Sequence, residues 1–177
     1  MPAVGSPAPE RALGRGHVLL ISHDLVGARM AGPGIRYLHL ARVLAREFDV
    51  LLAAPRGSTA PPTEDVRLLL YDAGDDAALG DAVRQARTVL VPALWLANVP
   101  ALGSSTASLV VDGYDPLLAE ALFLGRETDE LLCALTQAYV AGDFFLCAGE
   151  RQRDWWLGLL EAHGRINRHT FGEDPSL

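Results

Sequence analysis

Residues 17–46 have the sequence HVLLISHDLVGARMAGPGIRYLHLARVLAR, in which three local patterns follow one another. Residues 17–22 are a short apolar run typical of a buried strand, and the polar loop after it ends in Ala31-Gly32-Pro33-Gly34. The apolar residues that follow recur at helical spacing. The predicted apolar stripe of this helix consists of Ile35, Leu38, Ala41, Leu44, Ala45 and Phe48. A strand, loop and helix of this kind form the opening unit of a Rossmann-like sheet.

The loop of this unit is a candidate anion site. In a Rossmann-like unit the loop leads from the carboxyl end of the strand to a helix N-terminus, where free N–H groups favour phosphate or carboxylate. Gly32 and Gly34 would let a ligand approach the backbone, and Arg29 and Arg36 could add charge-assisted hydrogen bonds. The alternative is that the glycines only let the chain turn and that both arginines are solvated surface residues.

The rest of the chain alternates apolar runs with helical patterns. The predicted strands are residues 17–22, 49–54, 66–71, 88–91, 108–111 and 143–147. The further helices are expected at residues 76–87, 93–100, 117–124, 127–141 and 149–163. This alternation indicates an α/β fold with a doubly wound, parallel sheet of about six strands, in the order 3-2-1-4-5-6. Ligands of such sheets bind outside the carboxyl ends of the strands, at the switch point between the first and fourth strands.

Composition narrows the classes of function. The 177 residues suit one domain, and a hydrophobic content of 50% is enough for a full core. The net charge of −7 argues against nucleic acid or an anionic membrane surface as the main partner. All 15 basic residues are arginine, so a Schiff-base lysine and a P-loop lysine are both excluded.

The cysteines and the N-terminal segment indicate a cytoplasmic protein. Cys133 and Cys147 lack the spacing of a disulfide framework or a metal site, so two free thiols are expected. Residues 1–16 contain prolines but no apolar run, which predicts a disordered lead-in rather than a signal peptide. No window of 18 apolar residues predicts a transmembrane span, and no zincin motif predicts a metal site.

The dinucleotide-binding fingerprint is incomplete. A fold of that class needs Gly-x-Gly-x-x-Gly directly after the first strand and an acidic residue at the end of the second. From Gly32 the sequence is Gly-Pro-Gly-Ile-Arg-Tyr, so the third glycine is missing, and the loop is about ten residues too long. The second strand ends in Ala53-Ala54-Pro55, without a carboxylate. An NAD site is therefore not predicted, whereas a phosphate site remains open.

Two carboxylates follow the fifth predicted strand. Asp112 and Asp115 flank Gly113-Tyr114, where a carboxylate could accept a proton or hold a sugar hydroxyl. The structural alternative, which the spacing favours, is an Asx-type turn before Pro116.

Other polar residues lie at the same predicted edge of the sheet. Glu150 and Arg151 open the last predicted helix. The helix dipole favours an acidic residue at this end, so Glu150 needs no function, but it does not explain Arg151. His23 follows the first strand and could line the crevice, although a lone histidine is more often surface or core. Trp155 and Trp156 are interpreted as packing residues rather than as a sugar platform.

Three blocks of the sequence resemble a known family. They are HVLLISHD…RMAGPGIRYLHLARVLAREFDVLLAAP, VVDGYDPLLAE, and DFFLCAGERQRDWWLGLLEAHGRIN…DPSL. Together they resemble the N-terminal half of family 4 (group 1) glycosyltransferases, which have the two-Rossmann-domain GT-B fold. The resemblance covers roughly residues 17–177. It implies an acceptor-side domain at residues 17–164 and a tail at residues 165–177 that leads toward a C-terminal, donor-binding domain.

The resemblance also implies roles for particular residues. Gly32 and Gly34 would belong to the family's glycine-rich loop, which approaches the donor diphosphate, and Arg36 would lie beside it. The turn from Asp112 to Asp115 lies where many relatives have a histidine that contacts the donor sugar. Both aspartates are therefore catalytic candidates, and Asp112 is the candidate substitute for that histidine. Glu150 and Arg151 would match cleft-facing positions. No metal and no cofactor are implied.

The function that this resemblance implies is transfer of a sugar, with retention of configuration, from a nucleotide-sugar to a glycan or small-molecule acceptor. The full-length enzyme would be hexosyltransferase-like, whereas this chain alone would be inactive. The alternative is a stand-alone Rossmann-like domain that binds a ligand or partner without catalysis. An exposed interdomain face could also drive formation of a homodimer.

Overall fold

The computed structural model describes residues 16–59, 65–74 and 76–173, so the predicted lead-in lies almost entirely outside the described residues. Six parallel strands form one sheet in the order β3-β2-β1-β4-β5-β6, which confirms the predicted α/β class and strand order. The strands are β1 (His17–Ile21), β2 (Val50–Pro55), β3 (Val66–Tyr71), β4 (Ala86–Pro92), β5 (Ser108–Asp112) and β6 (Phe144–Leu146).

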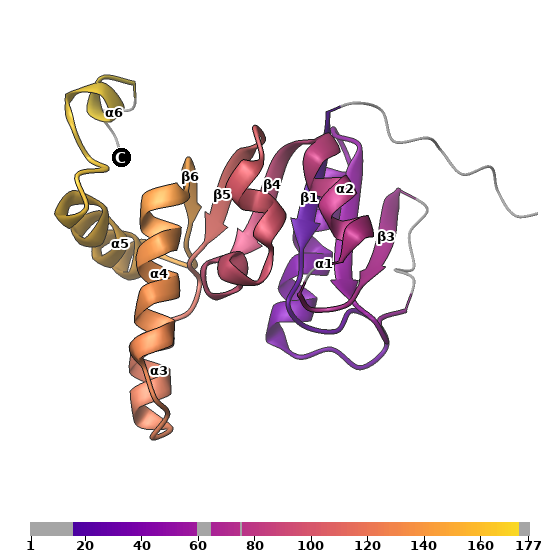
Figure 1. Cartoon of the computed structure of the whole chain (residues 1–177), viewed down its shortest axis with the longest axis horizontal. Coiled ribbons are helices and arrows are strands. Elements are labelled where there is room, and N and C mark those ends of the chain that lie inside the picture. The colour runs from indigo at the N-terminus through magenta and orange to yellow at the C-terminus, as the bar shows by residue number, and fades with distance from the viewer. Residues whose placement is uncertain (1–15, 60–64, 75, 174–177) are drawn as a thin grey trace, which may run out of the picture.

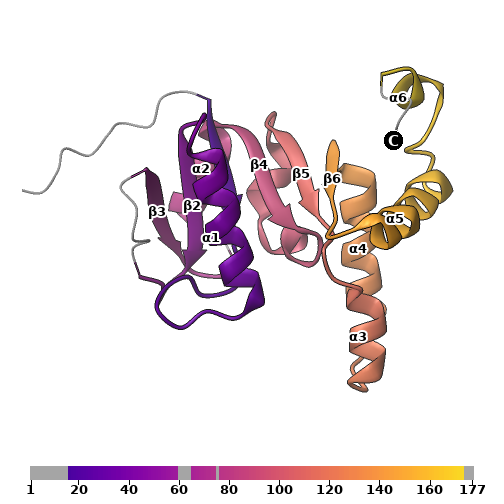
Figure 2. The same cartoon turned by 180° about the vertical axis from the view of Figure 1, so that it is seen from behind.

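Helices cover both faces of the sheet (Figures 1 and 2). They are α1 (Gly32–Leu44), α2 (Ala77–Gln85), α3 (Leu117–Phe123), α4 (Asp129–Ala141), α5 (Glu150–Ala162) and α6 (Arg168–Glu173). Two short 3-10 helices, Ala93–Asn98 and Pro100–Ser104, connect β4 to β5. Figure 2 shows α1 in front of the sheet, and Figure 1 shows α2 and α4 on the opposite side.

Side chains of each central strand alternate between two cores. Leu20 of β1 packs in the core under α1, whereas Leu19 and Ile21 pack in the larger core on the other face. Both faces are buried, which explains why these strands are continuous apolar runs rather than alternating ones. The continuous pattern was therefore a correct sequence signal for parallel strands.

Helix α1 differs from its predicted form. It begins at Gly32, and the face against the sheet consists of Gly34, Tyr37, Leu38 and Ala41, at positions i, i+3, i+4 and i+7. Ile35 and Phe48, which were predicted to face inward, are exposed. The predicted stripe was chosen from apolar side chains alone. It therefore left out Tyr37, whose ring is buried although it carries a hydroxyl.

The structure also refines the sequence prediction at the junction of α2 and β4 and in the tail. Helix α2 ends at Gln85, two residues before its predicted end at residue 87. Strand β4 follows directly and begins at Ala86 rather than at residue 88. The described part of the tail contains the short helix α6, for which no prediction was made from the sequence. Cys133 is exposed and Cys147 is half-buried, and both are free, as predicted.

His17 is a buried titratable group at the start of β1, away from the carboxyl edge of the sheet. Its side chain is enclosed at the start of β1, and neither ring nitrogen has a hydrogen-bond partner among the described residues. Burial lowers the pKa of His17, and the charge of Arg67 lowers it further, while Asp49 opposes the change. His17 is therefore neutral in the folded protein at pH 7.5.

Acid should destabilise the fold through His17. Because its folded pKa lies below the ordinary value of about 6.5, the unfolded chain binds more protons as the pH falls through that value. His17→Leu should thus raise the free energy of unfolding more at pH 5.5 than at pH 7.5, which urea denaturation at both pH values will measure. His17→Gln does not titrate either and should show the same change in pH dependence at lower absolute stability. An unchanged pH dependence in both variants would contradict this assignment.

Candidate functional site

The carboxyl ends of β1, β4 and β5 meet at the switch point of the sheet, and polar side chains gather there. Strand β1 leads into the loop that ends at α1, β4 leads into the first 3-10 helix, and β5 ends at Asp112. This is the edge at which open parallel sheets bind ligands.

An ion pair between Arg36 and Asp112 lies at the centre of this edge. Arg36 Nε donates to Asp112 Oδ2 and Arg36 Nη2 donates to Asp112 Oδ1, each at 2.8 Å, although the residues are 76 positions apart. The side chain of Asp112 is 0% exposed and that of Arg36 is 27% exposed. The hydrogen bonds to Asp112 raise the pKa of Arg36, so the guanidinium stays charged.

The ring of Tyr114 covers this guanidinium. Arg36 Cζ lies 5.0 Å from the centroid of the Tyr114 ring, which is the geometry of a cation–π contact. Burial raises the pKa of Tyr114, and the charges of Asp115 and Asp112 raise it further. Tyr114 is thus a neutral phenol at physiological pH and can act as a hydrogen-bond donor.

Several buried polar atoms around the ion pair lack hydrogen bonds among the described residues. They are Tyr37 Oη, Tyr114 Oη, His23 Nδ1 and Trp95 Nε1. The Asp115 carboxylate is close enough to Tyr114 to affect its pKa, but the two groups do not form a hydrogen bond of normal geometry. Trp95 Nε1 likewise lies close enough to Tyr71 to affect the pKa of Tyr71. Buried polar groups are normally satisfied, so Tyr37 Oη and His23 Nδ1, which have no such neighbour, indicate a place where a polar ligand or water completes the network.

These atoms lie within electrostatic reach of Asp112. Burial raises the pKa of Tyr37, and the charge of Asp112 raises it further. Burial lowers the pKa of His23, and the charges of Asp24, Asp115 and Asp112 oppose that change. The rings of His23 and Trp95 are 5.9 Å apart. Tyr71, near Trp95, donates instead to Ser22 O at 2.8 Å. The edge therefore combines the Arg36–Asp112 ion pair and the nearby carboxylate of Asp115 with neutral polar groups.

The N-terminus of α1 is open beside Arg36. Its N-cap is Ala31, which offers no side-chain cap, and no acidic residue lies in the first turn. No heavy atom lies within 4 Å of the position that a Cβ at Gly32 would occupy. The positive end of the helix is thus available to an anion.

Gly34 was predicted to let a ligand approach the backbone, but in the structure it packs against the loop between β1 and α1. A Cβ at this position would collide with the carbonyl oxygen of Leu25, in the loop between β1 and α1. The space above Gly34 is therefore filled by the protein backbone rather than left for a diphosphate.

The two glycines should respond differently to substitution by alanine. Gly34→Ala should lower the free energy of unfolding by about 1–3 kcal/mol, because the Leu25 loop must move. Gly32→Ala is the matched control, and its effect should stay within about 0.5 kcal/mol. Urea denaturation of both variants measures the difference, and equal losses would show that Leu25 does not approach Gly34 as described.

Of the other predicted site residues, Asp115 lies beside Tyr114 near the ion pair, whereas Glu150 and Arg151 belong to α5. Asp115 and Arg151 line an apolar pocket between α3 and α5, and Glu150 is exposed at the start of α5. Asp112, expected as a catalytic carboxylate, has both oxygens engaged by Arg36 and no exposure to solvent. Its geometry suits it to position Arg36 rather than to accept a proton from a substrate.

Sequence reasoning missed Tyr37 and Trp95. The available signal for Tyr37 was its place in the series Gly34, Tyr37, Leu38 and Ala41, at the spacing of one helix face. For Trp95 the sequence predicted only a short helix at residues 93–100.

Neither a metal cluster nor a membrane helix is found in the part of the chain that the structure describes. Within residues 16–59, 65–74 and 76–173, no group of three or more His, Cys, Asp or Glu side chains is placed to hold a metal ion. No helix in these ranges is long and apolar enough to span a membrane.

Comparisons with known proteins give similarity at the level of the fold. No protein-family model matches the chain, and no curated protein matches its sequence. A wide-type short-chain dehydrogenase/reductase from Veillonella parvula, solved with NADP, is similar with 16% identity and a TM-score of 0.47 over 74% of this chain and 67% of that chain. The C-terminal domain of the coenzyme A biosynthesis bifunctional protein CoaBC has 12% identity and a TM-score of 0.40, over 63% and 69% of the two chains.

A third solved structure is matched over a smaller part. It is the DNA/pantothenate metabolism flavoprotein from Streptococcus pneumoniae, with 11% identity and a TM-score of 0.32, over 43% of this chain. The match spans only 38% of the length of that flavoprotein. None of these three proteins is described as a glycosyltransferase.

Proposed function

We propose that this chain is the acceptor-side domain of a retaining, hexosyltransferase-like glycosyltransferase, which acts together with a second domain that binds the nucleotide-sugar. The crevice at the carboxyl edge would face the donor, and a glycan or small-molecule acceptor would bind from this side. The observation that carries the proposal is the guanidinium of Arg36, fixed by Asp112 beside the open N-terminus of α1.

Arg36 retains donors for a ligand. A guanidinium has five N–H groups, and the two bonds to Asp112 use two of them, so three are left. Gly32 leaves the adjacent helix N-terminus unobstructed. Together they would hold the diphosphate of a nucleotide-sugar by charge-assisted hydrogen bonds and by the helix dipole.

The unsatisfied neutral groups suit sugar hydroxyls. Tyr37, Tyr114 and His23 each present a buried polar atom without a partner among the described residues, and none carries a charge at neutral pH. A hydroxyl can both donate and accept, so it could satisfy such groups without the desolvation cost of a charged ligand.

Sugar transfer would place negative charge next to Arg36. The reaction breaks the bond between the anomeric carbon and a diphosphate oxygen, forms a bond to the acceptor oxygen, and releases the acceptor's proton. Charge develops on the leaving diphosphate, where Arg36 and α1 would stabilise it. In this proposal Asp112 is a positioning residue, because it holds Arg36 and is itself shielded from substrate.

The same edge is poorly suited to a dinucleotide. The carbonyl of Leu25 fills the space next to the Cα of Gly34. Strand β2 ends at Pro55, so no carboxylate is present there to bind a ribose hydroxyl. A nucleotide bound mainly by a partner domain is easier to reconcile with these features.

Two measurements test the proposal. The isolated chain should bind UDP-, GDP- and TDP-sugars no more tightly than about 1 mM in calorimetric titrations, because most donor contacts would come from the second domain. The complete protein should release nucleoside diphosphate from one of these donors when an acceptor is present. Micromolar binding by the isolated chain, or no release from any donor by the complete protein, would contradict the assignment.

A second candidate is a stand-alone ligand-binding domain without catalysis. The observation that favours it is the apolar pocket between α3 and α5, which is formed entirely by this chain. Ligand binding there, with no transfer activity in the complete protein, would support this candidate over the first.

A further inference from the structure

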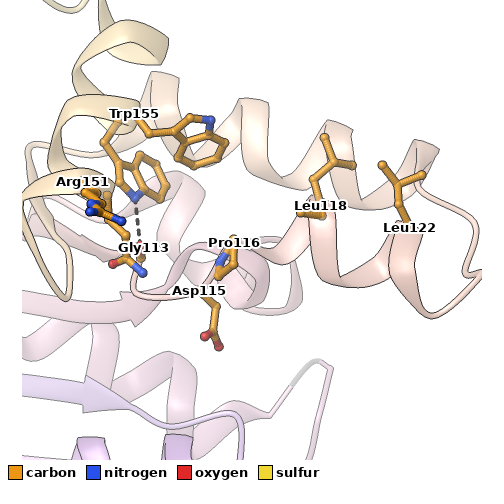
Figure 3. Close-up of a pocket in the computed structure, with 10 residues that line it drawn as sticks. Gly113, Asp115, Pro116, Leu118, Leu122, Arg151 and Trp155 are labelled. Atoms are coloured by element: carbon orange, nitrogen blue, oxygen red, sulfur yellow. Dashed lines mark hydrogen bonds between the residues drawn. The ribbon is translucent and has the colours of Figure 1, made fainter.

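A concave pocket lies between the segment that leads into α3 and the first turns of α5 (Figure 3). Its volume is about 460 Å³, which is within the usual range for small-molecule sites. Pro116, Leu118 and Leu122 form one wall. The opposite wall contains Trp155 and Trp156, whose rings meet edge to face at 5.6 Å.

The polar groups of the pocket floor are already engaged. Trp156 Nε1 donates to Gly113 O at 2.8 Å. Gln152 Nε2 donates to Tyr114 O, and Gln152 Oε1 accepts from Ala148 N, both at 2.7 Å. Because each of these groups already has a protein partner, apolar contacts dominate the interior of the pocket.

Arg151 is the polar group that remains available at the rim. It lies in the first turn of α5, and no ion pair or hydrogen bond holds its side chain in the part of the chain that the structure describes. Glu150 is adjacent in sequence, but neighbouring residues of a helix do not face each other. Figure 3 shows the Asp115 carboxylate pointing away from Trp155. The positive end of the α5 dipole adds to the charge of Arg151.

We infer that this pocket binds an amphipathic small molecule with an apolar ring system and one anionic group, such as an aromatic carboxylate. The ring would lie between the Leu118–Leu122 wall and the indole of Trp155, which is 45% exposed. The carboxylate would meet Arg151 at the rim. The pocket does not include Arg36, and its test uses no nucleotide-sugar, so this inference and the transferase proposal can fail separately.

The test uses the whole 177-residue chain and two probes of equal shape. Isothermal titration calorimetry with 2-naphthoate should give saturable binding at one site, with a Kd on the order of 0.1 mM. The neutral analogue 2-naphthylmethanol should bind several-fold more weakly. Arg151→Gln should weaken 2-naphthoate roughly fivefold and leave 2-naphthylmethanol unchanged, because only the charged contact is lost.

Two more variants make the result specific to this pocket. Arg153→Gln, on the same helix but outside the pocket lining, is the matched control and should bind both probes like wild type. Ala119→Trp places an indole in the pocket from the exposed side of α3 and should weaken both probes at least about tenfold. Thermal melting of each variant checks that it is folded.

Other outcomes overturn the inference. Absence of saturable binding, or binding that survives Ala119→Trp in the folded variant, would show that the pocket is not the site. Equal responses of Arg151→Gln and Arg153→Gln, or equal affinity of wild type for the two probes, would show that no anionic group is recognised.

Discussion

Gly113→Ala is expected to lower the free energy of unfolding by about 3 kcal/mol, at the upper end for overpacking. A Cβ at Gly113 would overlap the six-membered ring of Trp156, which is buried against it. Gly113 cannot move aside, because its N–H donates to Leu146 O and its carbonyl accepts from Trp156 Nε1, each at 2.8 Å. For a chain of this size the melting temperature should fall by roughly 6–12 °C.

A double-mutant cycle identifies the cause of this loss. Trp156→Phe removes the ring atoms that the new Cβ would meet, although it also leaves a cavity and removes one hydrogen bond. Gly113→Ala should therefore cost at least about 1 kcal/mol less in the Trp156→Phe background than in wild type. Strictly additive losses would show that the two side chains do not compete for this space.

Gly158→Ala is a control on the same helix as Trp156, and it should change the free energy of unfolding in the opposite direction. Gly158 is exposed in α5, and nothing lies within 4 Å of the position of its Cβ. Because alanine favours a helix more than glycine does, this change should raise the free energy of unfolding by about 0.5–1 kcal/mol. Urea denaturation can measure all of these variants under one set of conditions.

The sheet could be predicted because its signals are local. Each buried parallel strand is a continuous apolar run, and the rule that crossovers are right-handed leaves few arrangements of six such runs. Element boundaries were less accurate where two elements adjoin without a turn signal. Ala86 illustrates this, because no glycine or proline separates the end of α2 from the start of β4.

The site could be predicted only in part, because its contacts are long-range. The sequence indicated that Arg36 and Asp112 would both lie at the carboxyl edge, but spacing carries no information that they pair. Spacing also could not distinguish Gly32, which is open, from Gly34, which is filled by Leu25. Such distinctions depend on how the loop after β1 folds back, and that is a property of the tertiary structure.

Arg36→Met is expected to lower the free energy of unfolding by about 3 kcal/mol, because it leaves the carboxylate of Asp112 buried without its partner. Asp112→Leu should be milder, since Arg36 is partly exposed and water can solvate it. The double variant Arg36→Met/Asp112→Leu removes both charges and should recover most of the stability. Equal losses in the two single variants would show that the buried carboxylate is not the source of the cost.

The double variant also separates a structural role of Arg36 from a role in catalysis. For the transferase proposed above, the complete protein carrying this double variant should fold nearly as well as wild type and still turn over roughly ten- to hundredfold more slowly, because the guanidinium that would stabilise the leaving diphosphate is absent. Arg36→Lys is the companion variant, since it keeps the charge but cannot make both bonds to Asp112 while holding a phosphate. Its turnover should fall between wild type and the double variant. Wild-type turnover in the double variant would show that Arg36 and Asp112 form only a structural ion pair. A ligand at this edge would then have to be held by the neutral groups of Tyr37, Tyr114 and His23.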